Sequence, residues 1–247
     1  RTAVWKHLSR LRDRQMEIEA VRGRGYRLAR PLELLEEKTI RSGLAPGTRQ
    51  ALKKLKVYHE IGSTNQALVD ALGDGSIHGQ VALAEYQASG RGRGGNRWLS
   101  APGAGLALSV GWHFDGLPRT LSALSLATGV VLARALRRHG ARGVGLKWPN
   151  DLVHDGAKLG GILIESRGQL AGPVDVIIGI GINIDLPDGV AAAIGQPVTD
   201  MRRILGRTPS RNRLAVAVIG DLLGLLGDYH RHGFEAYIDA WRRLDNS

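Results

Sequence analysis

The chain of 247 residues contains no cysteine and has no long hydrophobic run. The lack of cysteine excludes a disulfide framework and thiolate chemistry, and it fits the reducing cytoplasm. The most apolar helix-like run, residues 121–136, is broken by serine, threonine, glycine and arginine, so it is too short and too polar to cross a bilayer. No signal peptide opens the sequence. We therefore expect a cytoplasmic protein with no membrane partner.

A P-loop is also missing, because the pattern G-x-x-x-x-G-K-[ST] does not occur. The stretch GRGRGGNRW does match the dinucleotide pattern G-x-G-x-x-G through Gly90, Gly92 and Gly95. That pattern needs a following helix whose N-terminus binds the pyrophosphate. Here a Ser-Ala-Pro-Gly segment and an alternating strand pattern follow instead. A Rossmann cofactor loop is therefore disfavoured.

Positive charge is what the sequence has in excess. The formal net charge is +11, and residues 1–30 carry nine Lys/Arg against three Asp/Glu. A basic end predicts a polyanionic partner, with nucleic acid the first candidate, although a solvated basic face is the alternative. The content of 43% hydrophobic and 23% charged residues is typical of a globular protein. The length allows one large domain, or one domain with a small appendage.

The first thirty residues predict a helix followed by a hairpin. Residues 1–15 repeat apolar side chains every three to four positions, and residues 18–28 alternate around an Arg-Gly-Arg-Gly turn. A winged helix-turn-helix ends in this order, and the alternative is a basic helix and hairpin of no special purpose. We expect residues 1–37 to be a partial winged helix-turn-helix DNA-binding domain and linker, without its earlier helices. The expected DNA contacts are Arg1, Lys6, Arg22 and Arg24.

The remaining residues, 38–247, predict one α+β domain. Alternating or β-branched runs predict strands, and longer periodic runs predict helices. The run PVDVIIGIGINI is apolar on both alternating faces, so we expect a central, buried strand. A short linking helix is expected over residues 32–44. A long helix is expected over residues 120–141, closed by Gly140.

The glycine–arginine stretch is better explained as an anion clamp. Glycine lets the backbone approach a ligand closely, and arginine binds carboxylate or phosphate in a planar, bidentate way. Arg91, Arg93 and Arg97 have no acidic residue among them, so they would repel one another unless an anion lay between them. A flexible surface loop rich in arginine and glycine is the alternative.

The motif GSTN at residues 62–65 has two interpretations that can both hold. Ser63, followed three residues later by Gln66, is a capping box that opens a helix. The hydroxyls of Ser63 and Thr64 can also face a ligand as hydrogen-bond donors and acceptors.

Other polar side chains stand at the ends of predicted strands. KWPND runs a strand into a proline turn, and we expect Lys147, Asn150 and Asp151 to cluster as a parallel-type strand would place them. An ordinary turn built from proline and asparagine is the alternative. GIGIN ends a buried strand with Asn183, which can close a turn or reach a phosphate or its metal. Lys158, in GAKLGG, would by itself be a surface charge.

Taken in order, these motifs resemble the family of bacterial bifunctional biotin–protein ligases and biotin operon repressors. The resemblance covers essentially the whole chain and rests on GSTN, EYQASGRGRGGNRW, LKWPND, KLGGILIE and GIGIN. Five short motifs in one order are far more specific than any one of them. The resemblance implies a class II synthetase-like mixed sheet flanked by helices. The family usually adds a small C-terminal β-barrel domain, which we expect to be absent here.

The resemblance implies a reaction in two steps. Biotin is activated with ATP and Mg²⁺ to biotinyl-5′-AMP, and the biotinyl group then passes to one lysine of a biotin carboxyl carrier protein, typically an acetyl-CoA carboxylase subunit. With the adenylate bound, some relatives dimerise and repress the biotin operon. Operator DNA and a second copy of the chain are therefore implied partners.

The resemblance also implies a role for each matching residue. Lys158 and Arg93 would compensate charge at the acyl-phosphate, and Asp151 would orient or deprotonate the acceptor lysine. Asn150 and Asn183 would lie near the nucleotide phosphates, with Mg²⁺ held by ATP near Asn183 and not by a cage of protein ligands. Biotin and the adenylate would be bound by Ser63, Thr64, Asn65, Gln87, Gly90, Arg91, Gly92, Arg93, Trp98, Lys158 and Gly161.

Two segments depart from the family pattern. Residues 185–201 lack the tryptophan that relatives often offer to adenine, so we expect adenine to rest on aliphatic side chains such as Val198. Gly94 and Asn96 stand where relatives can have further arginine. Two other functions stay open: a ligand-sensing DNA-binding regulator without ligase activity, and a lipoate or octanoate ligase-like acyltransferase. The second would lack the Gly-Arg-Gly-Arg loop.

Overall fold

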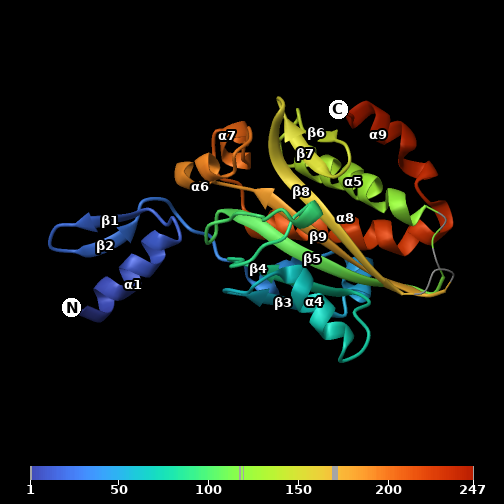
Figure 1. The fold of residues 1–247 in the computed structure, drawn as a ribbon, viewed down its shortest axis with the longest axis horizontal. Helices are drawn as coiled ribbons and strands as arrows, with labels where there is room; N and C mark the ends of the chain where they lie inside the picture. The colour runs from blue at the N-terminus through green and yellow to red at the C-terminus, as the bar shows by residue number, and fades with distance from the viewer. Residues whose placement is uncertain (1, 117, 119, 169–171, 247) are drawn as a thin grey trace.

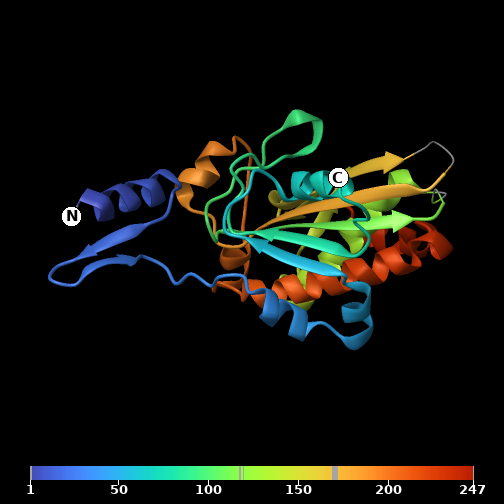
Figure 2. The same ribbon diagram turned by 90° about the horizontal axis from the view of Figure 1, so that it is seen from below.

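A seven-stranded mixed sheet with helices on both faces forms the body of the protein (Figures 1 and 2). The computed structural model describes residues 2–116, 118, 120–168 and 172–246. In spatial order the strands are β3 (Lys54–Tyr58), β4 (Gln80–Ala84), β5 (Gly105–Phe114), β9 (Val174–Asn183), β8 (Ala157–Gly168), β7 (Asp151–His154) and β6 (Gly145–Lys147). β3 and β4 are parallel, and the other neighbouring pairs are antiparallel. The α+β prediction is confirmed.

Helices cover the sheet unequally. The long helices α5 (Leu124–Arg138) and α8 (Arg211–His232) pack together on one face, with α9 (Ile238–Leu244) against α5. α4 (Thr64–Leu72) lies on β4, β5 and β9. The shorter helices are α2 (Glu37–Gly43), α3 (Pro46–Ala51), α6 (Asp188–Ala193) and α7 (Met201–Leu205). Within the described residues, no helix combines the length and the apolar character needed to cross a membrane.

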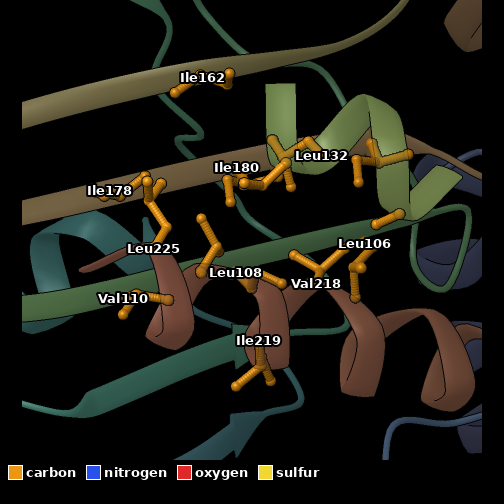
Figure 3. Packing of buried hydrophobic residues seen from close by; sticks show 14 of the residues in the cluster. Leu106, Leu108, Val110, Leu132, Ile162, Ile178, Ile180, Val218, Ile219 and Leu225 are labelled. Carbon is orange, nitrogen blue, oxygen red and sulfur yellow. The ribbon is translucent and has the colours of Figure 1, made fainter. Parts of the chain in front are cut away.

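The central strand β9 shows how the sequence divides the two faces of the sheet. Ile178 and Ile180 pack into the helical layer with Leu132 of α5 (Figure 3). Because successive side chains of a strand point to opposite faces, Gly179 and Gly181 occupy the other face. The predicted central position of this strand is confirmed. At these two positions the face opposite α5 and α8 carries no side chain of β9, and the candidate site lies there.

The N-terminal elements project from one end of the molecule (Figures 1 and 2). They are α1 (Thr2–Asp13) and the antiparallel pair β1 (Ile18–Val21) and β2 (Gly25–Leu28), so the predicted helix and hairpin are both present. Lys6, Arg22 and Arg24 are exposed, whereas Arg1 lies outside the described residues. The DNA-binding role of this part, and the domain boundary at residue 37, stay predictions.

Two helix predictions are wrong at their starts. The linking helix begins only at Glu37, and residues 31–36 have no regular secondary structure. The long helix begins at Leu124, after a 3-10 turn over Leu121–Ala123, and closes as expected before Gly140, whose φ of 101° is in the left-handed region.

Tertiary hydrogen bonds explain why residues 31–36 do not form a helix. The backbone N–H groups of Leu35 and Glu36 donate to the side chains of Glu85 (2.5 Å) and Asn212 (2.9 Å). An α-helix over this stretch would turn those groups toward its own carbonyls. Contacts distant in the sequence therefore override the local helical pattern.

A buried ion pair lies beneath residues 31–36. Arg211, the first residue of α8, is 2.6 Å from the carboxylate of Glu85, and the two side chains are 2% and 6% exposed. The Arg211 guanidinium also donates to the carbonyl oxygens of Gly105 and Glu33. Burial works to raise the pKa of Glu33, but hydrogen bonds from Asn212, Ser210 and the Arg211 backbone hold it below its ordinary value. The linker is thus joined to the body through charged groups.

Replacing Arg211 by methionine tests this ion pair. Arg211→Met leaves the Glu85 carboxylate buried without its counterion, so we expect the free energy of unfolding to fall by about 3–5 kcal/mol in urea denaturation. Arg242→Met is the control, because it removes an exposed pair with Asp239 and should cost no more than about 1 kcal/mol. An equal fall in the free energy of unfolding for the two substitutions would contradict the claim that the buried pair stabilises the fold more than an exposed one.

Candidate functional site

Most of the predicted site residues line one cavity of about 710 Å³. It lies on the face of the sheet that carries Gly179 and Gly181 of β9. Gly90 is an exception, since it lines a neighbouring hollow behind the Arg/Gly stretch. Lys147 is exposed and does not line the cavity, although its backbone pairs with Asp151. The predicted residues that line the cavity are Ser63, Thr64, Asn65, Gln87, Arg91, Gly92, Arg93, Trp98, Asn150, Asp151, Lys158, Gly161 and Asn183.

The floor of the cavity depends on glycine. A methyl group at Gly179 would collide with the side-chain oxygen of Asn65, and one at Gly181 would collide with the ring of Trp98. The missing side chains on β9 therefore let an amide and an indole lie directly against the sheet. Trp98 supplies an apolar wall, and Asn65 supplies a polar end.

The start of α4 provides the polar end. Ser63 caps the helix by accepting a hydrogen bond from the Gln66 backbone N–H. The Gln66 side chain donates to Asp70 (2.7 Å), so the reciprocal half of the predicted capping box does not form. The backbone N–H and hydroxyl of Thr64 both donate to Gln87 (2.8 and 3.1 Å). The motif is thus both a cap and part of the cavity wall.

Two further residues belong to this polar network and were missed by the sequence reasoning. The Ser109 hydroxyl on β5 lies 2.7 Å from the Thr64 hydroxyl and 2.6 Å from the Asn65 side-chain oxygen. The Asn65 amide nitrogen donates to Glu165 on β8 (2.8 Å). A signal existed for Ser109, because it is the one polar residue in the apolar run GLALSVGW at residues 105–112. Glu165 ends the motif KLGGILIE, but the sequence does not show that it meets Asn65, which is 100 positions away.

The Arg/Gly stretch forms a small hairpin, here called the Arg hairpin (residues 90–98). Arg91 and Arg97 form a β-bridge, and the Trp98 N–H donates to the Gly90 carbonyl (2.9 Å). Its tip is a 3-10 turn over Arg93–Gly95. A strand and not a helix follows, so the rejection of a Rossmann loop is confirmed.

The three arginines of this hairpin are not equivalent. No acidic residue stands among them in the sequence, but the fold supplies one for Arg91, whose guanidinium lies 2.8 Å from the Glu165 carboxylate. The acid is distant in sequence and arrives through the fold. Arg93 and Arg97 make no hydrogen bond or ion pair through their side chains with any residue that the structure describes. Two cations beside the cavity are therefore available to an anion.

A third cation comes from β8. The Lys158 ammonium lies 2.7 Å from the Asp151 carboxylate, and each side chain is 22% exposed. The expected parallel-type placement is wrong, because β6, β7 and β8 are antiparallel and KWPND is the β6–β7 turn. The two groups still meet because neighbouring antiparallel strands bring them to the same edge of the cavity.

The two asparagines hold the cavity walls through their side-chain N–H groups. Asn150 donates to the Ile162 carbonyl (2.8 Å), and Asn183 donates to the carbonyls of Thr199 (3.0 Å) and Lys158 (3.4 Å). Asn183 therefore helps to hold the segment after β9, whose Val198 lines the cavity. Among the described residues, no group of three or more histidine, aspartate or glutamate side chains could hold a metal ion.

The chain is similar to known proteins of one family. Residues 59–183 match the model of the biotin/lipoate A/B protein ligase family. The bifunctional ligase/repressor BirA of Escherichia coli strain K12 is 37% identical over 246 residues, which cover 100% of this chain and 74% of that protein. The biotin–[acetyl-CoA-carboxylase] ligase of Mycobacterium tuberculosis is 34% identical, covering 85% and 73%. A biotin protein ligase from Aquifex aeolicus, solved with biotin and ATP, is similar with a TM-score of 0.64 and 25% identity, covering 78% and 79%.

A single methyl group tests the glycine floor. Gly179→Ala forces Asn65 out of its position, so we expect a loss of about 1–3 kcal/mol in the free energy of unfolding, measured in urea. Gly224→Ala on the exposed side of α8 is the control, since its methyl group would meet nothing within 4 Å. The control should be neutral or stabilising by up to about 1 kcal/mol. A harmless Gly179→Ala would show that the floor does not need glycine.

Proposed function

The chain belongs to the biotin/lipoate A/B protein ligase family, and on this premise we propose that it is an ATP-dependent biotin–protein ligase. In the first step the biotin carboxylate attacks the α-phosphorus of ATP, which gives biotinyl-5′-AMP and pyrophosphate. In the second step a lysine amine of a biotin carboxyl carrier protein attacks the acyl carbon, and AMP leaves. No nucleophile from the enzyme is needed.

The observation that carries this proposal is the group of cations at the cavity. Arg93, Arg97 and Lys158 line the same space, and the first two lack a partner among the described residues. The first step brings two anions together, the carboxylate and the α-phosphate. Fixed positive charge lowers the cost of that approach and is most effective as charge builds up in the transition state.

The rest of the cavity suits the body of biotin. Ser63, Thr64 and Asn65 are buried at the polar end, where hydroxyl and amide groups can satisfy the ureido ring. Trp98 provides an apolar wall for the bicyclic rings and chain. Gln87 holds the Thr64 hydroxyl and so helps to keep this end rigid. Val198 and Ile194 offer aliphatic surface on which adenine can rest.

The pair of Lys158 and Asp151 suits both steps. The Lys158 ammonium can shift from Asp151 to the phosphate as the adenylate forms. The Asp151 carboxylate can then orient or deprotonate the incoming lysine. We place Mg²⁺ with the ATP phosphates near Asn183 and Asn150. When bound, Mg²⁺ neutralises phosphate charge.

A role in repression is a further part of the proposal. Two features support it: the exposed basic residues Lys6, Arg22 and Arg24 on the helix and hairpin, and similarity over 98–100% of this chain, and 74% of theirs, to relatives named bifunctional ligase/repressor. Operator DNA would be contacted through this end. A homodimer formed when the adenylate binds and a cytoplasmic location complete the proposal.

Transfer of label tests the ligase function. The protein is incubated with ATP, Mg²⁺, labelled biotin and a biotin carrier domain, and the carrier is expected to become labelled. Ligand-dependent operator binding without labelled carrier would favour the regulator. Labelling by octanoate or lipoate in place of biotin would favour the related acyltransferases.

Lys158→Ala separates binding from chemistry. Because the ammonium acts on charge that builds up in the transition state, we expect adenylate formation to slow by a factor of about 100 or more. The dissociation constant of biotin, measured by calorimetry, should change much less. Equal losses in rate and affinity would mean that Lys158 only binds the ground state.

Arg93→Gly tests the clamp role of the Arg hairpin. With one unpaired cation removed, biotinyl-5′-AMP should leave the enzyme faster, by about tenfold for a charge-assisted hydrogen bond. Release is followed by stopped-flow fluorescence after dilution into unlabelled ligand. Arg167→Gly, an exposed residue of β8 that does not line the cavity, is the control and should leave release unchanged. An unaltered rate in Arg93→Gly would contradict the clamp.

A further inference from the structure

One carboxylate oxygen joins the pocket floor to the Arg hairpin. Glu165 Oε2 accepts from the Asn65 amide nitrogen and from the Arg91 guanidinium, each at 2.8 Å. The Glu165 side chain is 19% exposed and Arg91 is 38% exposed. Glu165 is the last residue of the motif KLGGILIE, but the motif analysis assigned no role to it, and it contacts two residues to which a role was assigned.

On the floor side, Glu165 helps to determine which way the Asn65 amide points. The Asn65 oxygen accepts from Ser109, and the nitrogen donates to Glu165 at 2.8 Å and to the Leu163 carbonyl at a longer 3.5 Å. A carboxylate only accepts and a hydroxyl can donate, so this pair of neighbours specifies one orientation of the amide. Asn65 is buried, so a flipped amide would leave polar atoms unsatisfied.

On the hairpin side, Glu165 holds the base of a segment that is otherwise exposed. Residues 93–97 are all exposed, and the neighbouring hollow behind the hairpin is lined by Arg91 and Glu165. The ion pair ties the hairpin to β8, which is part of the rigid sheet. The position of the two unpaired cations, Arg93 and Arg97, therefore depends on where Arg91 is held.

We propose that Glu165 is a positioning residue that anchors the Arg hairpin over the cavity and fixes the Asn65 amide for ligand recognition. The part that concerns ligand recognition rests on the proposed ligase function. Because both partners use one oxygen, the hairpin and the floor share a single support. Glu165 itself is not expected to contact the reacting atoms.

Two substitutions separate the two contacts. Glu165→Gln keeps an oxygen that can accept from Asn65 but removes the charge that holds Arg91. Glu165→Leu removes both. Asp221→Asn is the matched control, because it breaks the Arg138–Asp221 pair between α5 and α8, in the helical layer away from the cavity.

Limited proteolysis of the unliganded protein measures the anchor. Trypsin cleaves after Arg93 and Arg97, and mass spectrometry resolves each cut, with cleavage after Arg22 and Arg24 as an internal reference. Glu165→Gln should speed cleavage within the Arg hairpin by about threefold, the scale of a partly exposed ion pair, and leave the reference cuts unchanged. In an Arg91→Met background the same substitution should add nothing. Unchanged hairpin cleavage in Glu165→Gln would overturn the anchor.

Steady-state adenylation measures the effect on the floor. Glu165→Gln should keep the KM for biotin within about twofold, whereas Glu165→Leu should raise it about tenfold with a smaller change in kcat, because a buried amide loses its acceptor. Equal KM values for the two variants would overturn the role in orienting Asn65. A wild-type protein that forms no biotinyl-5′-AMP would refute the proposed function, and the proteolysis result would still decide the anchor. If Glu165→Leu fails to fold, calorimetric titration of Glu165→Gln with biotin takes its place. A loss of biotin affinity above about tenfold in Glu165→Gln would overturn the role of Glu165 in orienting Asn65.

Discussion

The side-chain alternation of β9 is the constraint on which the rest of the structure depends. Ile178, Ile180 and Ile182 fill the layer between the sheet and α5 and α8, and Gly179 and Gly181 leave room on the opposite face. A β-branched side chain at either glycine would close the floor on which Asn65 and Trp98 lie. One ten-residue strand thus supplies both the centre of the core and the cavity, so stability and binding cannot be changed independently there.

The four cations near the cavity differ in whether they have an acidic partner. Arg91 and Lys158 each have an acidic partner in the structure, Glu165 and Asp151. Arg93 and Arg97 have none among the described residues. Paired cations keep fixed positions at the edges of the cavity, and unpaired cations at the hairpin tip remain free to meet an anionic ligand. A site with both paired and unpaired cations fits an enzyme that must first bind two anions and then hold the activated product.

Local patterns predicted much of this from sequence. The strand identities, the central place of residues 173–184 and the Ser63 cap follow from periodicity and from helix-end chemistry. The start of the linking helix could not be predicted, because Glu85 and Asn212 come from 50 and 176 positions away and outweigh local propensity. Glu165 stands in the motif KLGGILIE but was assigned no role for the same reason: its partners Asn65 and Arg91 are 100 and 74 positions away, and only the fold brings them together. The lack of a following helix correctly excluded a Rossmann loop at the Arg hairpin, and the anion-clamp role stays a prediction.

The central claim is that this cavity joins the biotin carboxylate to the α-phosphate of ATP. Exchange of labelled pyrophosphate into ATP measures that step alone. It needs no carrier protein, and it does not depend on the proposed DNA-binding role of the N-terminal elements. The account predicts exchange that requires both biotin and Mg²⁺ and that falls strongly in Lys158→Ala. Exchange that is absent in the folded wild-type protein, or that proceeds equally without biotin, would contradict it.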